Sequence, residues 1–112
     1  MESKIDTIYL RHILDSITKI EKFVNSLPEK DFFSDDLRVS AVLREFEVIG
    51  EAARQMPDEY KKLHPEIEWS LMISMRNNLI HHYFGINEEI VWKTYTQDLP
   101  ILKEKILKLL QT

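Results

Sequence analysis

Residues 4–26 read KIDTIYLRHILDSITKIEKFVNS, and their apolar side chains recur at intervals of three or four positions. This spacing is typical of an amphipathic α-helix, which buries one stripe of side chains and leaves the opposite face in water. The sequence therefore predicts a first helix from about Lys4 to Ser26, ended by Pro28. The residues of the apolar stripe and its margin are Ile5, Tyr9, Leu10, Ile13, Leu14, Ile17, Ile20 and Val24.

A second long helix is predicted after Ser34-Asp35-Asp36, because such side chains cap the free backbone N–H groups at a helix start. Gly50 interrupts the bulky residues of this helix and costs about 1 kcal/mol of helix propensity. We therefore expect a neighbouring helix to pack closely against it. The apolar positions of the predicted helix are Leu37, Val42, Phe46, Ile49, Ala53 and Met56.

The second half of the chain continues the helical pattern. Residues 57–65 have room for one short helical turn, and a third helix is expected from residue 68 or 69 to residue 82, ending near Gly85. Asn87 is expected to cap a further helix, and Pro100 to divide the C-terminal segment in two. The apolar stripe after Pro100 consists of residues 102, 106 and 109. The lysines at 103, 105 and 108 are expected to face solvent.

With only two glycines and four prolines, the chain is predicted to be one all-α domain (residues 1–112), an antiparallel bundle of four or five helices. The absence of cysteine and of a long apolar segment predicts a cytoplasmic protein with no membrane association. The net charge of −4 argues against a broad basic surface for nucleic acid. Any attraction for RNA must therefore be local.

The segment RNNLIHHY at residues 76–83 concentrates polar side chains where the apolar pattern would otherwise continue. At about 100° per residue, Arg76 and Tyr83 fall on nearly the same stripe, and Asn77 lies one turn before His81. His81 is about 140° around the helix from Arg76, so a cleft between two copies of the chain would bring the two residue types together more easily. A homodimer is therefore part of the hypothesis.

These groups suit RNA cleavage by transesterification, in which the ribose 2′-OH attacks the adjacent phosphate. His81 would transfer protons, because an imidazole titrates near neutral pH. Arg76 would neutralise charge that develops on the phosphoryl oxygens, and Asn77 would orient His81 or bind the phosphate. No cofactor and no metal are predicted, because the four histidines lack paired metal-ligand spacing.

Each of these residues also has a structural interpretation. Arg76 could form an ion pair with Glu51 or Glu47, and Tyr83 could be a half-buried aromatic residue. Asn78 is expected to be a surface or capping residue, and His82 to be exposed. Glu51, Asn78 and His82 are the residues that could support the site.

Together, Arg76, His81 and Tyr83 match the R-x4-H-x-Y motif of the HepT branch of the HEPN superfamily, and residues 49–52 (IGEA) resemble a second signature of that family. The resemblance covers nearly the whole chain. It implies a HEPN-type helical bundle that dimerises with the motif helices at a shared cleft. It also implies a metal-independent ribonuclease that acts on tRNA or mRNA as a toxin.

In the HepT branch the usual partner is a minimal nucleotidyltransferase antitoxin, which attaches AMP to the motif tyrosine, here Tyr83. A phosphate-rich adduct on Tyr83 would occupy the anion site beside Arg76. Two alternatives remain at this point. One is a non-catalytic HEPN dimer that binds nucleotide or RNA, or serves as acceptor and scaffold for a nucleotidyltransferase; the other is a helical dimer without a ligand.

Overall fold

The computed structural model describes residues 4–80 and 87–111, without the side chains of residues 75 and 77–80. Every element in these ranges is helical, which confirms the predicted all-α class. The elements are α1 (Lys4–Val24), α2 (Glu29–Phe33), α3 (Asp36–Gln55), α4 (Asp58–Leu63), α5 (Trp69–Ile80), α6 (Glu88–Lys93), the π-helical turn η1 (Thr94–Asp98) and α7 (Leu99–Gln111).

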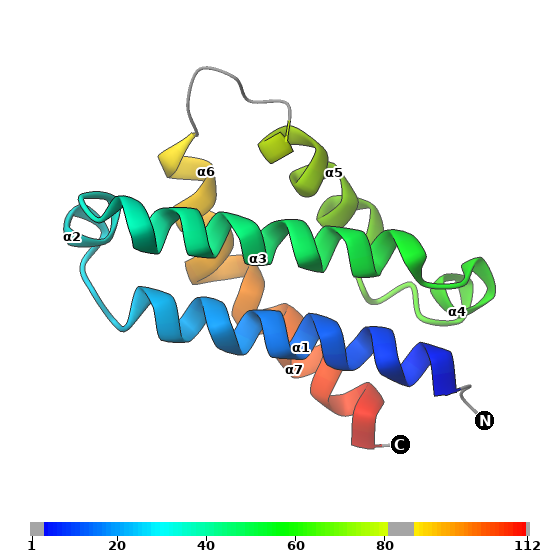
Figure 1. Cartoon of the computed structure of the whole chain (residues 1–112). Coiled ribbons are helices and arrows are strands. Elements are labelled where there is room, and N and C mark those ends of the chain that lie inside the picture. The colour runs from blue at the N-terminus through cyan, green and yellow to red at the C-terminus, as the bar shows by residue number, and fades with distance from the viewer. Residues whose placement is uncertain (1–3, 81–86, 112) are drawn as a thin grey trace.

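Helix α3 lies at the centre of the arrangement, with α1 antiparallel to it on one side and α5 on the other (Figure 1). Helix α7 packs against α1, while the short helices α2 and α4 lie at the two ends of α3 (Figure 1). A central helix between two others leaves part of its surface facing outward between them. This surface of α3 is the one that matters for the candidate site.

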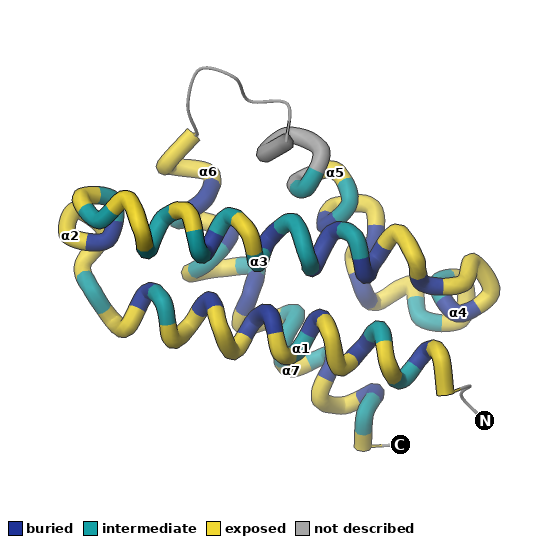
Figure 2. The backbone as a smooth tube through the Cα atoms, viewed as in Figure 1, coloured by how far each residue is buried: buried dark blue, intermediate teal, exposed yellow. Residues whose placement is uncertain are grey.

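The core follows the predicted stripes, and buried positions recur along each long helix (Figure 2). From α1 it contains Leu10, Ile13, Ile17, Ile20 and Val24; from α3 it contains Val42, Phe46, Ile49, Ala53 and Met56; from α7 it contains Ile106 and Leu109. Two predicted stripe residues are exposed instead, Ile5 and Leu37. Each lies in the first turn of its helix, at an end of the bundle, where packing from neighbouring helices ends.

Polar residues begin and end the helices largely as expected. The Asp35 side chain caps α3 by accepting a hydrogen bond from the Arg38 N–H at 3.2 Å, and the Asn87 side chain caps α6 through the Ile90 N–H at 3.1 Å. Helix α1 ends two residues earlier than predicted. Asn25 and Ser26 have φ values of 52° and 57°, in the left-handed region that stops a helix.

The short helix α2 was not predicted, and its aromatic side chains connect it to α6. Phe32 and Phe33 each lie with their ring centroids 5.9 Å from that of Trp92. Helix α4 occupies the segment in which one short helical turn was expected. Helix α5 begins at Trp69 as predicted, whereas its expected end near Gly85 lies outside the described residues.

Pro100 does not break the C-terminal segment into two separate helices. Residues 88–111 form one helical run in which the π-helical turn η1 ends at Asp98, and Pro100 is the second residue of α7. The wider turn pairs the Leu99 N–H with the Thr94 carbonyl, five residues back, where an α-helix would pair four residues back. The helical run continues through Pro100, and the expected division is a change of helix type just before it.

The lysines of α7 were expected to face solvent, and two of them make tertiary contacts instead. Lys103 Nζ lies 3.0 Å from a carboxylate oxygen of Glu21 on α1, and Lys105 Nζ donates to the Glu66 carbonyl at 2.7 Å. Lys108 is exposed, as predicted. The two contacts hold α7 against α1 and against the segment that leads into α5.

Candidate active site

Gly50 determines how closely α5 approaches α3. A Cβ atom built on Gly50 would overlap the Cβ of Arg76 and would lie 2.9 Å from both the Arg76 Cγ and the Met72 carbonyl oxygen. Only a residue without a side chain leaves room for this contact. The close helix packing predicted from Gly50 is confirmed, and the residue it admits is the motif arginine.

The next residue, Glu51, connects three polar side chains. It accepts hydrogen bonds from Arg54 at 2.7 and 3.2 Å and from the Gln55 amide at 3.1 Å. Arg76 approaches the same carboxylate from α5, with an Nη2–Oε2 distance of 3.5 Å. Of the two ion-pair partners considered for Arg76, the structure therefore places Glu51 beside it.

These contacts keep Glu51 ionised. The hydrogen bonds from Arg54 and then Gln55, with the nearby charges of Arg54 and Arg76, lower the pKa of Glu51 to about 2. The same pairing raises the pKa of Arg54 above its ordinary value. At neutral pH the group is thus a carboxylate between two guanidinium ions, and it pairs with both of them.

Arg76 and Glu51 line an open groove of about 550 Å³ on the outward surface of α3. One side of the groove comes from Tyr9 and His12 on α1, and the other from Arg76 on α5. The residues contributed by α3 are Arg44, Glu47, Val48, Glu51, Ala52, Arg54 and Gln55. Three arginines against two glutamates give the groove a positive balance on a chain of net charge −4.

The predicted site residues are described to different extents. Arg76 lies at the groove, with its side chain 28% exposed and paired with Glu51. Asn77 and Asn78 belong to α5, directly after Arg76, but the structure describes only their backbone. The predicted proton-transfer residue His81, its neighbour His82 and the predicted AMP acceptor Tyr83 lie outside the described residues.

Sequence reasoning did not assign Tyr9, His12, Arg44 or Arg54 to the site. Tyr9 was expected only in the core stripe, and it both packs against the core and lines the groove. Arg54 could have been predicted from its spacing, because it stands three residues after Glu51 and therefore on the same face of the helix. The sequence gives no comparable indication for His12, because its position beside the groove depends on how α1 packs against α3.

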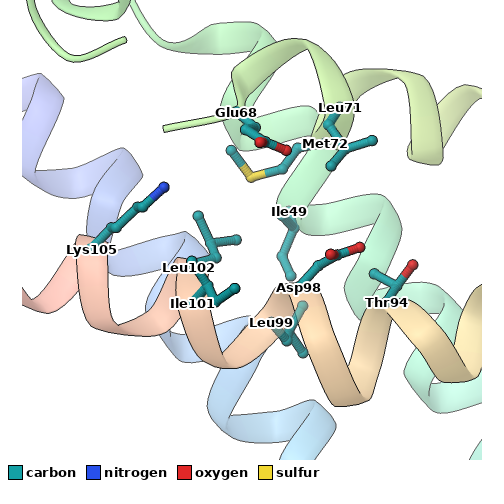
Figure 3. A pocket seen from close by; sticks show the side chains of 10 residues that line it. All are labelled: Ile49, Glu68, Leu71, Met72, Thr94, Asp98, Leu99, Ile101, Leu102 and Lys105. Carbon is teal, nitrogen blue, oxygen red and sulfur yellow. The ribbon is translucent and has the colours of Figure 1, made fainter. Parts of the chain in front are cut away.

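A second cavity, to which α3 contributes Ile49, is smaller and mainly apolar. It has a volume of about 100 Å³, and the side chains of Leu71 and Met72 lie across it from Ile101 and Leu102 (Figure 3). The pairing of arginines and a carboxylate that distinguishes the groove is not part of its lining. We therefore place the candidate active site in the groove.

Within residues 4–80 and 87–111, no three histidine, aspartate or glutamate side chains are grouped so that they could hold a metal ion. No helix in these ranges has the length and apolar character required to cross a bilayer.

Comparison with known proteins assigns the chain to a family. The model of the family "Ribonuclease HepT-like" matches residues 13–109, and the chain belongs to this family of HEPN-type proteins. This confirms the resemblance drawn from the R-x4-H-x-Y motif. No solved structure matches the chain significantly.

Several named proteins resemble the chain over most of its length. A "Probable ribonuclease HepT" of Thermococcus cleftensis is 45% identical over 101 residues, which are 90% of this chain and 92% of that protein. A "Putative RNase" of Caldanaerobacter subterraneus subsp. tengcongensis is 35% identical over 103 residues, 92% of each chain. A "Gamma-glutamylcyclotransferase and putative RNase" of Methanocaldococcus jannaschii is 40% identical over 93% of this chain, which spans 47% of that longer protein.

Proposed function

We propose that the protein is a metal-independent ribonuclease that cleaves tRNA or mRNA by transesterification. The observation that carries this proposal is the position of Arg76, which Gly50 and Glu51 hold at a positively balanced groove. The family supports the same class of activity. The acidic net charge is compatible with it because the attraction is concentrated where the substrate phosphate would lie.

In the proposed reaction the ribose 2′-oxygen forms a bond to the adjacent phosphorus, and the bond from phosphorus to the 5′-oxygen of the next nucleotide breaks. The 2′-OH proton leaves to a base, and a proton is delivered to the departing 5′-oxygen. His81 is the proposed proton-transfer group. The products are a 2′,3′-cyclic phosphate and a 5′-hydroxyl, and the bond changes balance without an added water molecule.

Arg76 is proposed to bind the phosphoryl oxygens on which charge accumulates. Glu51 already accepts short hydrogen bonds from Arg54 and Gln55, so its contact with Arg76, at 3.5 Å, is the longest of the set. When a phosphate binds, Arg76 is proposed to donate to it while Arg54 continues to compensate the Glu51 carboxylate. Asn77, the next residue of α5, is proposed to orient His81 or to bind the phosphate.

We also propose that two copies of the chain form the complete site. A twofold axis that pairs the motif segments would place Arg76 of one protomer near His81 of the other and would double the local positive charge. This overcomes the angular separation of about 140° between the two residues on one helix.

The biological role we propose is that of a toxin in a toxin–antitoxin pair. Its partner would be a nucleotidyltransferase that transfers AMP from ATP to the hydroxyl oxygen of Tyr83: the tyrosine O–P bond forms, the bond between the α- and β-phosphates breaks, and pyrophosphate leaves. Because Tyr83 is predicted to share a helical stripe with Arg76, the new phosphodiester would add negative charge there and compete with RNA for Arg76. Replacement of Tyr83 by Phe should abolish AMP incorporation, and undiminished incorporation would refute the assignment.

The decisive experiment is incubation of unmodified protein with total tRNA in EDTA, followed by analysis of the product ends. Wild type should produce 2′,3′-cyclic phosphates, and His81→Ala should not. Arg76→Ala should lower the cleavage rate about 10²- to 10³-fold, as expected for loss of a charge-stabilising donor. Arg76→Ala keeps the Cβ that contacts Gly50, so the packing of α5 should survive.

Arg11→Ala is the matched control, because Arg11 is an exposed arginine of α1 that does not line the groove. It should cleave like wild type. A folded, unmodified dimer that binds tRNA in an Arg76-dependent way but yields no cyclic phosphate would replace the ribonuclease proposal with a phosphate-binding role. Loss of helicity in His81→Ala would point to a structural histidine.

A further inference from the structure

Two aromatic rings form the α1 side of the groove. Tyr9 and His12 stand one helical turn apart, and their ring centroids are 6.3 Å apart in an edge-to-face arrangement with an interplanar angle of 84°. Tyr9 is half-buried and packs against the core, whereas His12 is exposed. One ring is thus anchored, and the other extends from it toward solvent beside the groove.

The groove therefore combines two kinds of binding surface. Arg54 and Arg76 supply guanidinium groups suited to a phosphate, and Tyr9 and His12 supply ring faces and edges suited to a nucleobase. Its volume of about 550 Å³ is in the range of sites for small organic ligands, roughly 300–1,000 Å³. A nucleotide has an anionic part and a flat aromatic part and so matches both surfaces.

We propose that Tyr9 and His12 bind a nucleobase that flanks the phosphate held by Arg76, and that this site selects single-stranded RNA. This inference rests on the proposed ribonuclease function and adds the part of the substrate that the arginines cannot recognise. Bases in an A-form duplex are stacked on one another, so only an unpaired base can leave the stack and lie against the rings. Stacking accepts any base, so we expect a preference for strand state with little preference for sequence.

The test separates base binding from both phosphate binding and cleavage. Fluorescence anisotropy would measure the affinity of the full-length protein for two short oligonucleotides with 2′-O-methyl riboses, which cannot undergo transesterification. One carries adenine at every position, and the other has the same backbone with abasic positions. Wild type should prefer the adenine oligonucleotide, and equal affinity for the two would overturn the proposal.

His12→Ala should weaken binding of the adenine oligonucleotide at least about fivefold and leave the abasic one unchanged. Tyr9→Leu, which keeps an apolar side chain against the core, should act in the same direction. His12→Phe should restore binding, because it retains a ring face. If His12→Phe loses as much affinity as His12→Ala, the imidazole nitrogens are required and stacking is refuted.

Arg11→Ala is again the matched control and should bind both oligonucleotides like wild type. Equal weakening of both oligonucleotides by His12→Ala would overturn the base-binding role, since the backbone is common to the two. Failure of the ribonuclease proposal would give a different result: tRNA would remain uncut, while His12→Ala would still weaken binding of the adenine oligonucleotide and not of the abasic one. If tRNA is cut but Tyr9 and His12 can be replaced without effect on binding, only the base site is refuted.

Discussion

Gly50 and Arg76 meet at a point where α3 and α5 leave no space for a methyl group. In an ordinary exposed helix position, Gly→Ala would stabilise the fold by about 1 kcal/mol through helix propensity. Here we expect Gly50→Ala to lower the free energy of unfolding by about 1–3 kcal/mol, because α5 must move away from α3. It should also reduce cleavage through displacement of Arg76.

Urea denaturation at equilibrium measures whether Gly50→Ala raises or lowers the free energy of unfolding. Ser40→Ala, an exposed helical replacement elsewhere on α3, is a suitable comparison for the effect of adding helix propensity. A stabilised Gly50→Ala variant would mean that α5 is not held as close to α3 as described.

Glu51 predicts a dependence of stability on pH. Its pKa is lower in the folded chain, about 2, than its ordinary value of 4.5, so its contribution is present above pH 4.5 and is lost as the pH falls toward 2. We therefore expect Glu51→Gln to show a smaller decrease in melting temperature than wild type between pH 6 and acid pH.

Glu59→Gln, at an exposed position of α4, serves as the control and should follow the wild-type curve. Parallel curves for wild type and Glu51→Gln would show that the carboxylate is not stabilised by its neighbours.

The residue chemistry of the candidate site was only partly accessible from sequence. Arg76 stood out because it interrupts an apolar pattern, and Glu51 was one of two candidate ion-pair partners, the other being Glu47. Tyr9 and His12 could not be assigned in this way. Their role depends on how α1 packs beside α3, which is a tertiary property that the periodicity of α1 does not contain.

Among the elements, α3 depends on the cap at its N-terminus. Asp35 accepts a hydrogen bond from the Arg38 backbone N–H and another from the Arg38 side chain at 3.1 Å. We expect Asp35→Ala to lower the free energy of unfolding by about 1 kcal/mol, and Asp35→Asn to retain most of the stability, since Asn caps a helix about as well as Asp. Chemical denaturation of the three proteins would measure this, and equal losses in both variants would assign the stability to the ion pair with Arg38.

The long helices were predictable because each buries a stripe with a period near 3.6 residues, whereas the connections were not. Helix α2 has five residues, too few for a periodic pattern, and it exists because Phe32 and Phe33 pack against Trp92. The π-helical turn before Pro100 could not be predicted either. Proline lacks a backbone N–H group, and the sequence does not distinguish a change of helix type from the end of a helix. Stripe positions at helix ends, such as Ile5, were overestimated as core because periodicity does not indicate where the neighbouring helix stops.

At the scale of the whole molecule, the charge distribution predicts a weak dependence of RNA binding on salt. A chain of net charge −4 with three arginines along its groove should contact few phosphates. The slope of log K against log salt concentration for single-stranded RNA should then be no steeper than about −2 for each groove, from about −0.7 per phosphate contact. Anisotropy titrations over a range of KCl concentrations would measure it, and a much steeper slope would reveal a larger basic surface than the groove.

Helix α3 carries the core stripe on one face and the groove residues on another, so both depend on a single rotational register. A one-residue insertion after Gly50 would turn every later residue by about 100°, moving Met56 out of the core and Glu51 and Arg54 away from Arg76 at the same time. Changes of chain length between α1 and α2, or between α4 and α5, would leave that register intact. Sequences that diverge from this chain should therefore gain and lose residues in the connections while α3 keeps a constant length between its N-cap and Met56.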